Sequence, residues 1–410
     1  MSQPKSQPRS QPKSQQSEGA GTTYADAVSG WADHLVGGGR TTWSAWEPMA
    51  TPPSSTPPSS SRPLPDATHL ELLRTMNERA GEPLPGLAAA LLDTPLPGRG
   101  RVDVPLPWAG PGRPRFGQPP IEPTLLPAEE LLRLAVGLLA RLLPGVTPPP
   151  PEPELARWPM PWRRRFRLHG SPGTVAGVRR QLVAQGLVET DWRPVHVVLG
   201  RSLEVMMAEH WTASALAGGQ LRWGTLWRRT QTTGPPGQLD VISTAARLAA
   251  APDRRREPVH LVLARDADEV AAQVAAILRT RPFDLVAPTD AAQVDLLRRL
   301  NRLTAVAHGP ARVRRLATTL AALLEDSAGH DREPVVPTSA LQWAEPWSDG
   351  AVDRARAAAE DPGSAGYSVH GAPEALAPGT DGQGSIDPQH TLAVAVEGCL
   401  RAWRRQEGAT

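Results

Sequence analysis

The sequence predicts an α/β fold: a parallel sheet with helices on both faces, preceded by a mainly helical, Pro-rich N-terminal region and a disordered tail. Short apolar runs rich in β-branched residues, such as PVHVVLG at 194–200 and PVHLVLA at 258–264, alternate with helical segments. These runs are continuously apolar, as expected for strands buried on both faces of a parallel sheet. Many of the 46 prolines lie in clusters outside this alternating region, so they mark linkers.

Composition shifts along the chain divide it into five parts. Residues 1–22 form an imperfect SQPK-SQPR-SQPK repeat that cannot bury a core, and TPPSSTPPSSSRPLP at 51–65 is a linker. TPPPPEP at 147–153 gives the main boundary. The expected parts are a tail and linker at 1–66, a helical Pro-rich region at 67–146, a linker at 147–160, the α/β domain at 161–327, and an irregular C-terminal region with a final helix at 328–410.

In the N-terminal region we expect four helices. The first covers TYADAVSGWADHL from residue 23, and a Ser/Thr-x-x-Glu capping box at Thr68 opens one over 69–79. Another covers 84–93. Pro127 opens the fourth, with two glutamates in its first turn, and it ends at Pro144.

In the α/β domain the expected strands are 165–170, 194–200, 258–264 and 283–288, with a further candidate at 303–309. Helices are expected over 178–186, 202–216, 237–250, 266–280, 290–303 and 310–326. Asp266 or Asp268 caps the fourth of these, and Pro310 opens the last. A closing helix is expected over 386–406.

Bulk composition excludes several classes of protein. The net charge is only +2, which gives no strong field for specific nucleic-acid binding. The single cysteine excludes an intrachain disulfide, and the usual zinc patterns are missing. The N-terminus has no apolar signal region and no apolar run is long enough to cross a bilayer, so we expect a cytoplasmic protein that does not bind membranes. The high Arg, Ala, Gly and Pro content is typical of a GC-rich genome.

The stretch LHGSPGTVAGVRRQ after the first strand raises the main functional question. A strand, a Gly-rich turn and a helix N-terminus form a natural anion site, with Gly170, Ser171, Gly173 and Thr174 as the candidate cradle. A Walker A loop needs a lysine here and a dinucleotide fingerprint needs another glycine spacing. A tight turn without a ligand is therefore the alternative.

The segment resembles the phosphosulfate-binding loop of the sulfotransferase family, G-x-P-K-[ST]-G-T-T, in its Gly170, Pro172 and Thr174. The family's lysine position is Gly173 here. PVHVVLGRSLEVMMAEHW at 194–211 is also similar to that family, and the resemblance covers about 164–305. It implies that Arg201 holds a nucleotide phosphate, with Trp211 on the next helix. The implied cofactor is PAPS or a related phosphonucleotide. The missing lysine implies weak or no catalysis, as in a pseudoenzyme.

Sulfuryl transfer needs cations on the leaving phosphate and a base on the acceptor hydroxyl. The catalytic residues stay unassigned. The available groups are the cations Arg179, Arg180 and Arg201 and the candidate bases His169, His196 and His210.

The alternative class is a non-catalytic scaffold, similar to a von Willebrand factor A domain, that binds protein partners through its Pro-rich arms. The metal-binding motif of that fold would fall on 200–204, where its acidic residue is missing, so no metal site is expected. The AEHW segment at 208–211 also lacks a second zinc ligand. Asp240 and Asp266 are expected to be helix caps, and the tryptophans to be packing anchors: Trp158, Trp162, Trp192, Trp223 and Trp227. A nucleotide site requires that Arg201 point at the 170–174 turn.

Overall fold

The computed structural model describes residues 24–46, 66–96, 104–107, 119–148, 164–251, 258–285, 289–325, 345–377 and 386–408. The chain forms two compact units, one made of residues 1–92 and 100–126 and the other of residues 93–99 and 127–410. The Ser/Gln/Pro tail, the linker at 51–65 and most of the expected linker at 147–160 lie outside the described residues.

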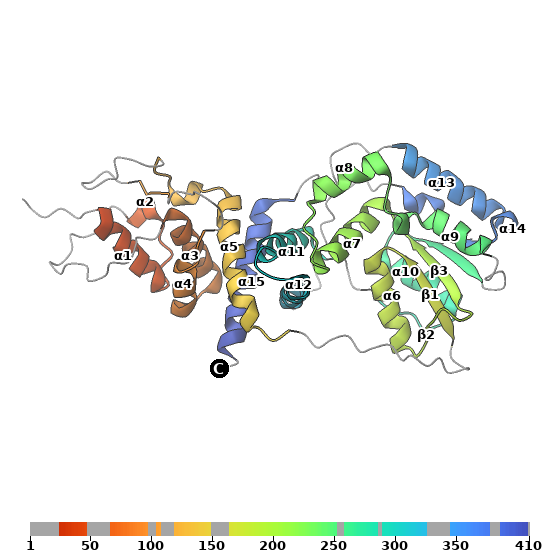
Figure 1. Ribbon diagram of the computed structural model, residues 1–410, viewed down its shortest axis with the longest axis horizontal. Coiled ribbons are helices and arrows are strands. Elements are labelled where there is room, and N and C mark those ends of the chain that lie inside the picture. Colours follow the sequence, from red (N-terminus) through yellow and green to blue (C-terminus); the bar gives the residue numbers. More distant parts are fainter. Residues whose placement is uncertain are drawn as a thin grey trace, which may run out of the picture. The chain divides into compact units, whose positions relative to one another are not determined.

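The first unit is helical. It contains α1 (Tyr24–Val36), α2 (Trp43–Trp46), α3 (Ala67–Ala80) and α4 (Pro85–Leu92) (Figure 1). The expected helices are confirmed, but the capping box at Thr68 is wrong. The N-cap of α3 is Asp66, whose carboxylate accepts a hydrogen bond from the amide of His69 at 3.0 Å. Thr68 is already inside the helix and buried.

The second unit holds a five-stranded, all-parallel sheet, which confirms the predicted fold class. Its strands are β1 (Arg165–Gly170), β2 (Val188–Glu189), β3 (Val195–Gly200), β4 (Val259–Leu263) and β5 (Ser368–His370). Their spatial order is β2-β1-β3-β4-β5, so the chain moves to one side of β1 first and then to the other. Ligands bind at such a reversal in open α/β sheets, at the carboxyl ends of the strands.

Helices cover both faces of the sheet (Figure 1). On one face, buried side chains of β1, β3 and β4 pack against α6 (Pro172–Ala184) and α10 (Ala267–Leu278), with Phe166 fully buried at the centre. The other face packs on α9 (Val241–Ala250), while α13 (Glu345–Glu360) and the short α14 (Pro362–Ala365) lie against β5.

Three sequence predictions in this unit are wrong. The expected strand at 283–288 is irregular over its described part, where the side chain of Gln181 in α6 donates to the carbonyl of Asp284. The candidate strand at 303–309 instead continues a helix, α11 (Ala291–Thr304), into a turn. The region at 328–390, expected to be irregular, supplies α13, α14 and the edge strand β5.

The remaining helices of this unit form a helical layer. They are α5 (Ala128–Leu142), α7 (Leu203–Leu216), α8 (Trp223–Thr233), α11, α12 (Pro310–Glu325) and α15 (Pro388–Glu407). Helices α5 and α15 pack side by side (Figure 1). The Cys399 thiol donates to the carbonyl of Ala135 at 3.6 Å, and its complete burial raises its pKa. This single cysteine is therefore a packing residue and not a nucleophile.

The same helical substructure occurs once in each unit. The segment DATHLELLRTMNERA at α3 matches DAAQVDLLRRLNRLT at α11, and the buried positions of α3 recur at the matching positions of α11. Each helix places a buried asparagine at the turn that follows an earlier helix. Asn77 donates to the carbonyls of Leu35 and Gly39, and Asn301 donates to those of Ala215 and Gly219, at 2.7 and 2.9 Å in both cases.

The turns held by these asparagines are also built alike. Trp31 in α1 donates its indole N–H to the carbonyl of Thr41, and Trp211 in α7 donates to Leu221, ten residues later in each case. The glycines in the two turns, Gly38 and Gly218, have φ of 91° and 93°. The repeated sequence and hydrogen bonds indicate that the chain contains this helical substructure twice.

Replacing either asparagine should destabilise the unit that contains it. Asn301→Ala leaves two carbonyls without their buried donor, and we expect a loss of about 1–3 kcal/mol in the free energy of unfolding. Asn77→Ala should give a similar loss in the first unit. Urea denaturation measures both. Val306→Ala, at an 89 % exposed position, is the control and should change nothing; an equal effect of all three variants would contradict this assignment.

The edge strand β5 should make the fold sensitive to acid. His260 Nδ1 lies 3.0 Å from His370 Nε2. Burial lowers the pKa of both rings, and the positive charge of His370 lowers that of His260 further. The folded chain then binds fewer protons than the unfolded chain, so stability is lost as the pH falls below about 6.5. Thermal unfolding of His370→Asn should show a smaller loss between pH 7.5 and 5.5 than the wild type. An unchanged pH dependence would contradict this.

Candidate functional site

The Gly-rich turn after β1 has the predicted strand–turn–helix structure. Gly170 ends β1 with φ of 135°, and a Cβ atom there would lie 2.5 Å from the carbonyl oxygen of Leu199 on β3. Only glycine fits this conformation and this close approach. Ser171 is then the N-cap of α6, and Pro172 begins the helix, where its missing N–H costs nothing.

Arg201 lies beside this turn. It directly follows β3, which is paired with β1 up to the register Gly170 to Leu199. The two segments therefore leave neighbouring strands at the same edge, where the strand order reverses. Arg201 points at the turn at 170–174, which is the geometry that a nucleotide site would require. Arg201 and the turn bind one common group.

That group is the side-chain carboxylate of Glu209 on α7. The Ser171 hydroxyl donates to it, and the Thr174 amide donates to Oε2 at 2.7 Å. The Thr174 hydroxyl donates to Oε1 at 2.7 Å, and Arg201 Nη1 donates to the same oxygen at 3.3 Å. The residues predicted to cradle a phosphate thus enclose a carboxylate of the protein itself.

The carboxylate is buried and well satisfied. The Glu209 and Arg201 residues are 6 % and 9 % exposed. A buried charge is tolerated only when it is paired and hydrogen-bonded, and here a cation, two hydroxyls and an amide do this. The site also lies at the N-terminus of α6, where the helix dipole favours negative charge.

Glu209 replaces the usual cap of α6. A serine at the N-cap normally accepts from the amide two or three residues later. Ser171 makes no such bond, and the Thr174 amide bonds to Glu209 instead. Gly173 makes this approach possible, since a Cβ atom there would lie 2.9 Å from Cγ of Glu209. The glycine at this position therefore makes room for an acid.

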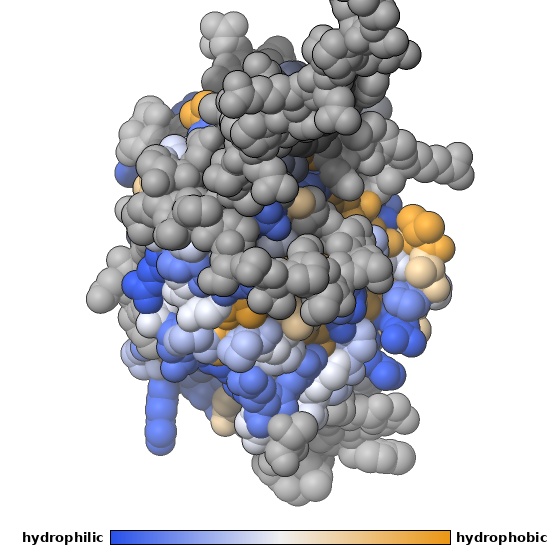
Figure 2. Space-filling view, turned by 90° about the vertical axis from the view of Figure 1, so that its left-hand side faces the viewer, coloured by the Kyte–Doolittle hydropathy of each residue, from blue (hydrophilic) through white to orange (hydrophobic). Residues whose placement is uncertain are grey.

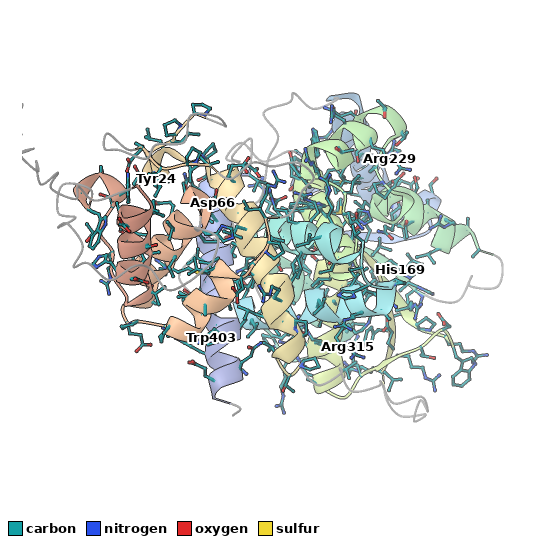
Figure 3. All side chains as sticks on the ribbon, turned by 60° about the vertical axis from the view of Figure 1, so that its left-hand side comes forward. Tyr24, Asp66, His169, Arg229, Arg315 and Trp403 are labelled. Atoms are coloured by element: carbon teal, nitrogen blue, oxygen red, sulfur yellow. The ribbon has the colours of Figure 1, made fainter. Side chains whose placement is uncertain are left out.

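The other predicted site residues lie in different surroundings. His169 Nε2 is 3.1 Å from His196 Nδ1, and these two rings lie on β1 and β3 (Figure 3 labels His169). His210 contacts Gln238 at 2.7 Å, and burial lowers its pKa. Arg179 pairs with Glu189 of β2 at 2.6 Å. Arg180 lies exposed on α6. The roles of these residues as bases or cations stay predictions.

Several structural interpretations are confirmed. Asp240 and Asp266 cap α9 and α10 by accepting from the amides of Ser243 and Glu269. Trp223 and Trp227 are buried, as expected of packing anchors. For Trp192 the prediction is wrong, because its side chain is 57 % exposed. Trp158 and Trp162 lie outside the described residues.

Within the described part of the chain, no group of three or more His, Cys, Asp and Glu side chains is placed to hold a metal ion. In the segment proposed by analogy with the von Willebrand factor A domain, Ser202 is the N-cap of α7 and Arg201 binds Glu209. A small enclosed cavity lies elsewhere, between α7, α11 and α12, and is lined by residues such as Thr212, Leu297 and Leu324.

Sequence reasoning missed Glu209. Its AEHW segment lacks a second zinc ligand and lies in the stretch similar to the sulfotransferase family, and neither interpretation gives a role to this glutamate, which follows Arg201 by eight residues on the next helix. Met206 and Trp211 within the same helix are buried. An acid among such neighbours needs a buried partner, and that requirement is the signal that could have identified it.

Comparisons with protein-family models, with curated proteins and with solved structures find no match to this chain. Among the described helices, none combines the length and the apolar character needed to cross a bilayer. On the face seen in Figure 2, the coloured residues are mostly hydrophilic, with small hydrophobic areas between them.

Removing the charge of Glu209 should destabilise the second unit. Glu209→Gln leaves Arg201 buried without its counter-charge, and we expect a loss of about 3 kcal/mol in the free energy of unfolding. Glu269→Gln is the matched control: this acid also bonds to a turn after a strand, but in a more exposed place, and should cost about 1 kcal/mol or less. Chemical denaturation measures both. Equal effects would show that Glu209 has no special role.

Proposed function

We propose that this protein is a non-catalytic α/β module that binds protein partners. We further propose that its Gly-rich turn at 170–174 binds an internal carboxylate, which holds neighbouring elements of the fold together, and not a ligand phosphate. The observation that carries the proposal is the Glu209 carboxylate in the turn. A ligand phosphate would have to displace a buried acid that already has four donors. The Pro-rich arms predicted from the sequence are further candidate contacts for partners.

Two features support an absence of catalysis. The chain has no lysine beyond Lys5 and Lys13, so the cradle lacks the cation that reaches the outer phosphates in P-loop proteins. Arg201, the cation in the best position, is already neutralised by Glu209. Sulfuryl transfer needs a free positive charge on the leaving phosphate, and this pairing removes it.

A second candidate is a sulfotransferase-like protein that binds PAPS or a related phosphonucleotide with weak or no turnover. The observation that favours it is the convergence of Ser171, Thr174 and Arg201 on one anion. The same donors would suit a phosphate if α7 moved and withdrew its carboxylate.

Calorimetry with 3′,5′-adenosine bisphosphate separates the two candidates. For the non-catalytic module we expect no heat of binding and no thermal shift with wild-type protein. Micromolar binding that disappears in Arg201→Ala would overturn this proposal in favour of the nucleotide-binding protein. Arg312→Ala, which removes an exposed cation on α12 away from the turn, is the control and should change neither result.

A further inference from the structure

An exposed tryptophan lies at the opposite end of the sheet from Glu209. Trp192 belongs to the turn between β2 and β3, close to the amino end of β3, and 57 % of its surface is exposed. Among the tryptophans whose side chains the structure describes, the others are buried or half-buried. Burial of a large aromatic side chain is a major source of stability, and the exposed ring of Trp192 is accessible for a contact outside the fold.

Two arginines accompany this ring. The guanidinium carbon of Arg165, the first residue of β1, lies 3.9 Å from the centre of the Trp192 ring, and that of Arg193 lies 5.9 Å from it. Stacking on the ring orients the guanidinium while leaving N–H groups at its edge for a carboxylate. The Nε atom of Arg165 is buried and has no hydrogen-bond partner within the described structure.

The turn that carries the ring is strained. Arg193 has φ of 49°, in the left-handed region that non-glycine residues rarely adopt, and it precedes Pro194. Such strain costs about 1–3 kcal/mol and is concentrated at functional sites.

We propose that Arg165, Trp192 and Arg193, here called the arginine–tryptophan face, bind an acidic segment of a protein partner. Trp and Arg dominate the binding energy of protein interfaces, and guanidiniums pair well with carboxylates. The face is not uniformly basic, because the carboxylate of Asp191 is 74 % exposed and lies 3.5 Å from Arg167 Nε. A phosphate backbone would meet this acid, whereas a protein segment can place a matching residue opposite it.

This inference deepens the proposed function, since it names the surface and the partner class of the binding module. It uses the amino ends of β1 and β3, whereas the Glu209 site lies at their carboxyl ends. Nucleotide binding lost in Arg201→Ala would therefore overturn the proposed function without touching the face. Conversely, a peptide-binding result that contradicts the role of the arginine–tryptophan face would not affect the interpretation of the Glu209 site.

The full-length protein should be screened on an array of 12-residue peptides that vary in Asp/Glu and in apolar content. We expect the signal to rise with Asp/Glu content. The strongest peptides, labelled with fluorescein, should bind at least about tenfold more weakly to Arg165→Ala and to Trp192→Ala by fluorescence anisotropy. Arg312→Ala, an exposed arginine on α12, is the matched control and should bind like the wild type. Thermal unfolding verifies that each variant is folded.

Three results would overturn the proposal. The first is a signal that does not depend on acidic content. The second is peptide binding that all variants retain. The third is tighter binding of a labelled 12-residue oligo-dT that the same two substitutions abolish, which would assign the face to single-stranded nucleic acid instead.

Discussion

The buried carboxylate of Glu209 fixes the arrangement at the carboxyl edge of the sheet. Through its hydrogen bonds it connects three segments of the fold: the turn after β1, the residue after β3, and the middle of α7. Because a buried charge must keep all its partners, none of these elements can shift alone without exposing an unpaired group. Helices α6 and α7 also pack directly on each other.

The same interaction accounts for the composition of the turn. Gly170 is needed for the positive φ and for the approach to β3, and Gly173 for the approach of the acid. Ser171 and Thr174 supply hydroxyls that a phosphate-binding turn would also use. A turn that holds an internal carboxylate and one that holds a ligand phosphate therefore require nearly the same residues. The two kinds of turn differ in whether the bound anion is a carboxylate of the protein or the phosphate of a ligand.

This similarity explains what the sequence could and could not predict. Strands β1, β3 and β4 and most helices follow from local patterns of apolar residues and caps, and they were predicted correctly. Strand β5 was missed because it has only three residues, Ser368–His370, and pairs with β4 more than a hundred residues earlier. The apolar residues Phe283 and Leu285 make the segment at 283–288 resemble a strand in sequence. These side chains do pack on the core, but the described part of the segment pairs with no strand of the sheet, and the carbonyl of Asp284 accepts from Gln181 of α6.

The candidate site was predicted in part. The turn and Arg201 were identified, and they do lie together. Glu209 was not, because a carboxylate in the middle of a helix normally indicates a solvated surface, and only the three-dimensional structure reveals its partners. The repeated helical substructure was visible in the sequences of α3 and α11. The repeat becomes evident only when the two segments are aligned with each other, because the pattern of each helix alone predicts no partner.

Chemical rescue of an empty turn tests the role of Glu209 most directly. The melting temperature of Glu209→Ala should be measured in increasing sodium formate, with sodium chloride at equal ionic strength as the reference. If the turn is an anion site filled by the protein, formate should raise the melting temperature of this variant and leave that of the wild type unchanged. The double variant Glu209→Ala/Arg201→Ala should respond less. A response to formate that is the same in all three proteins would contradict the account.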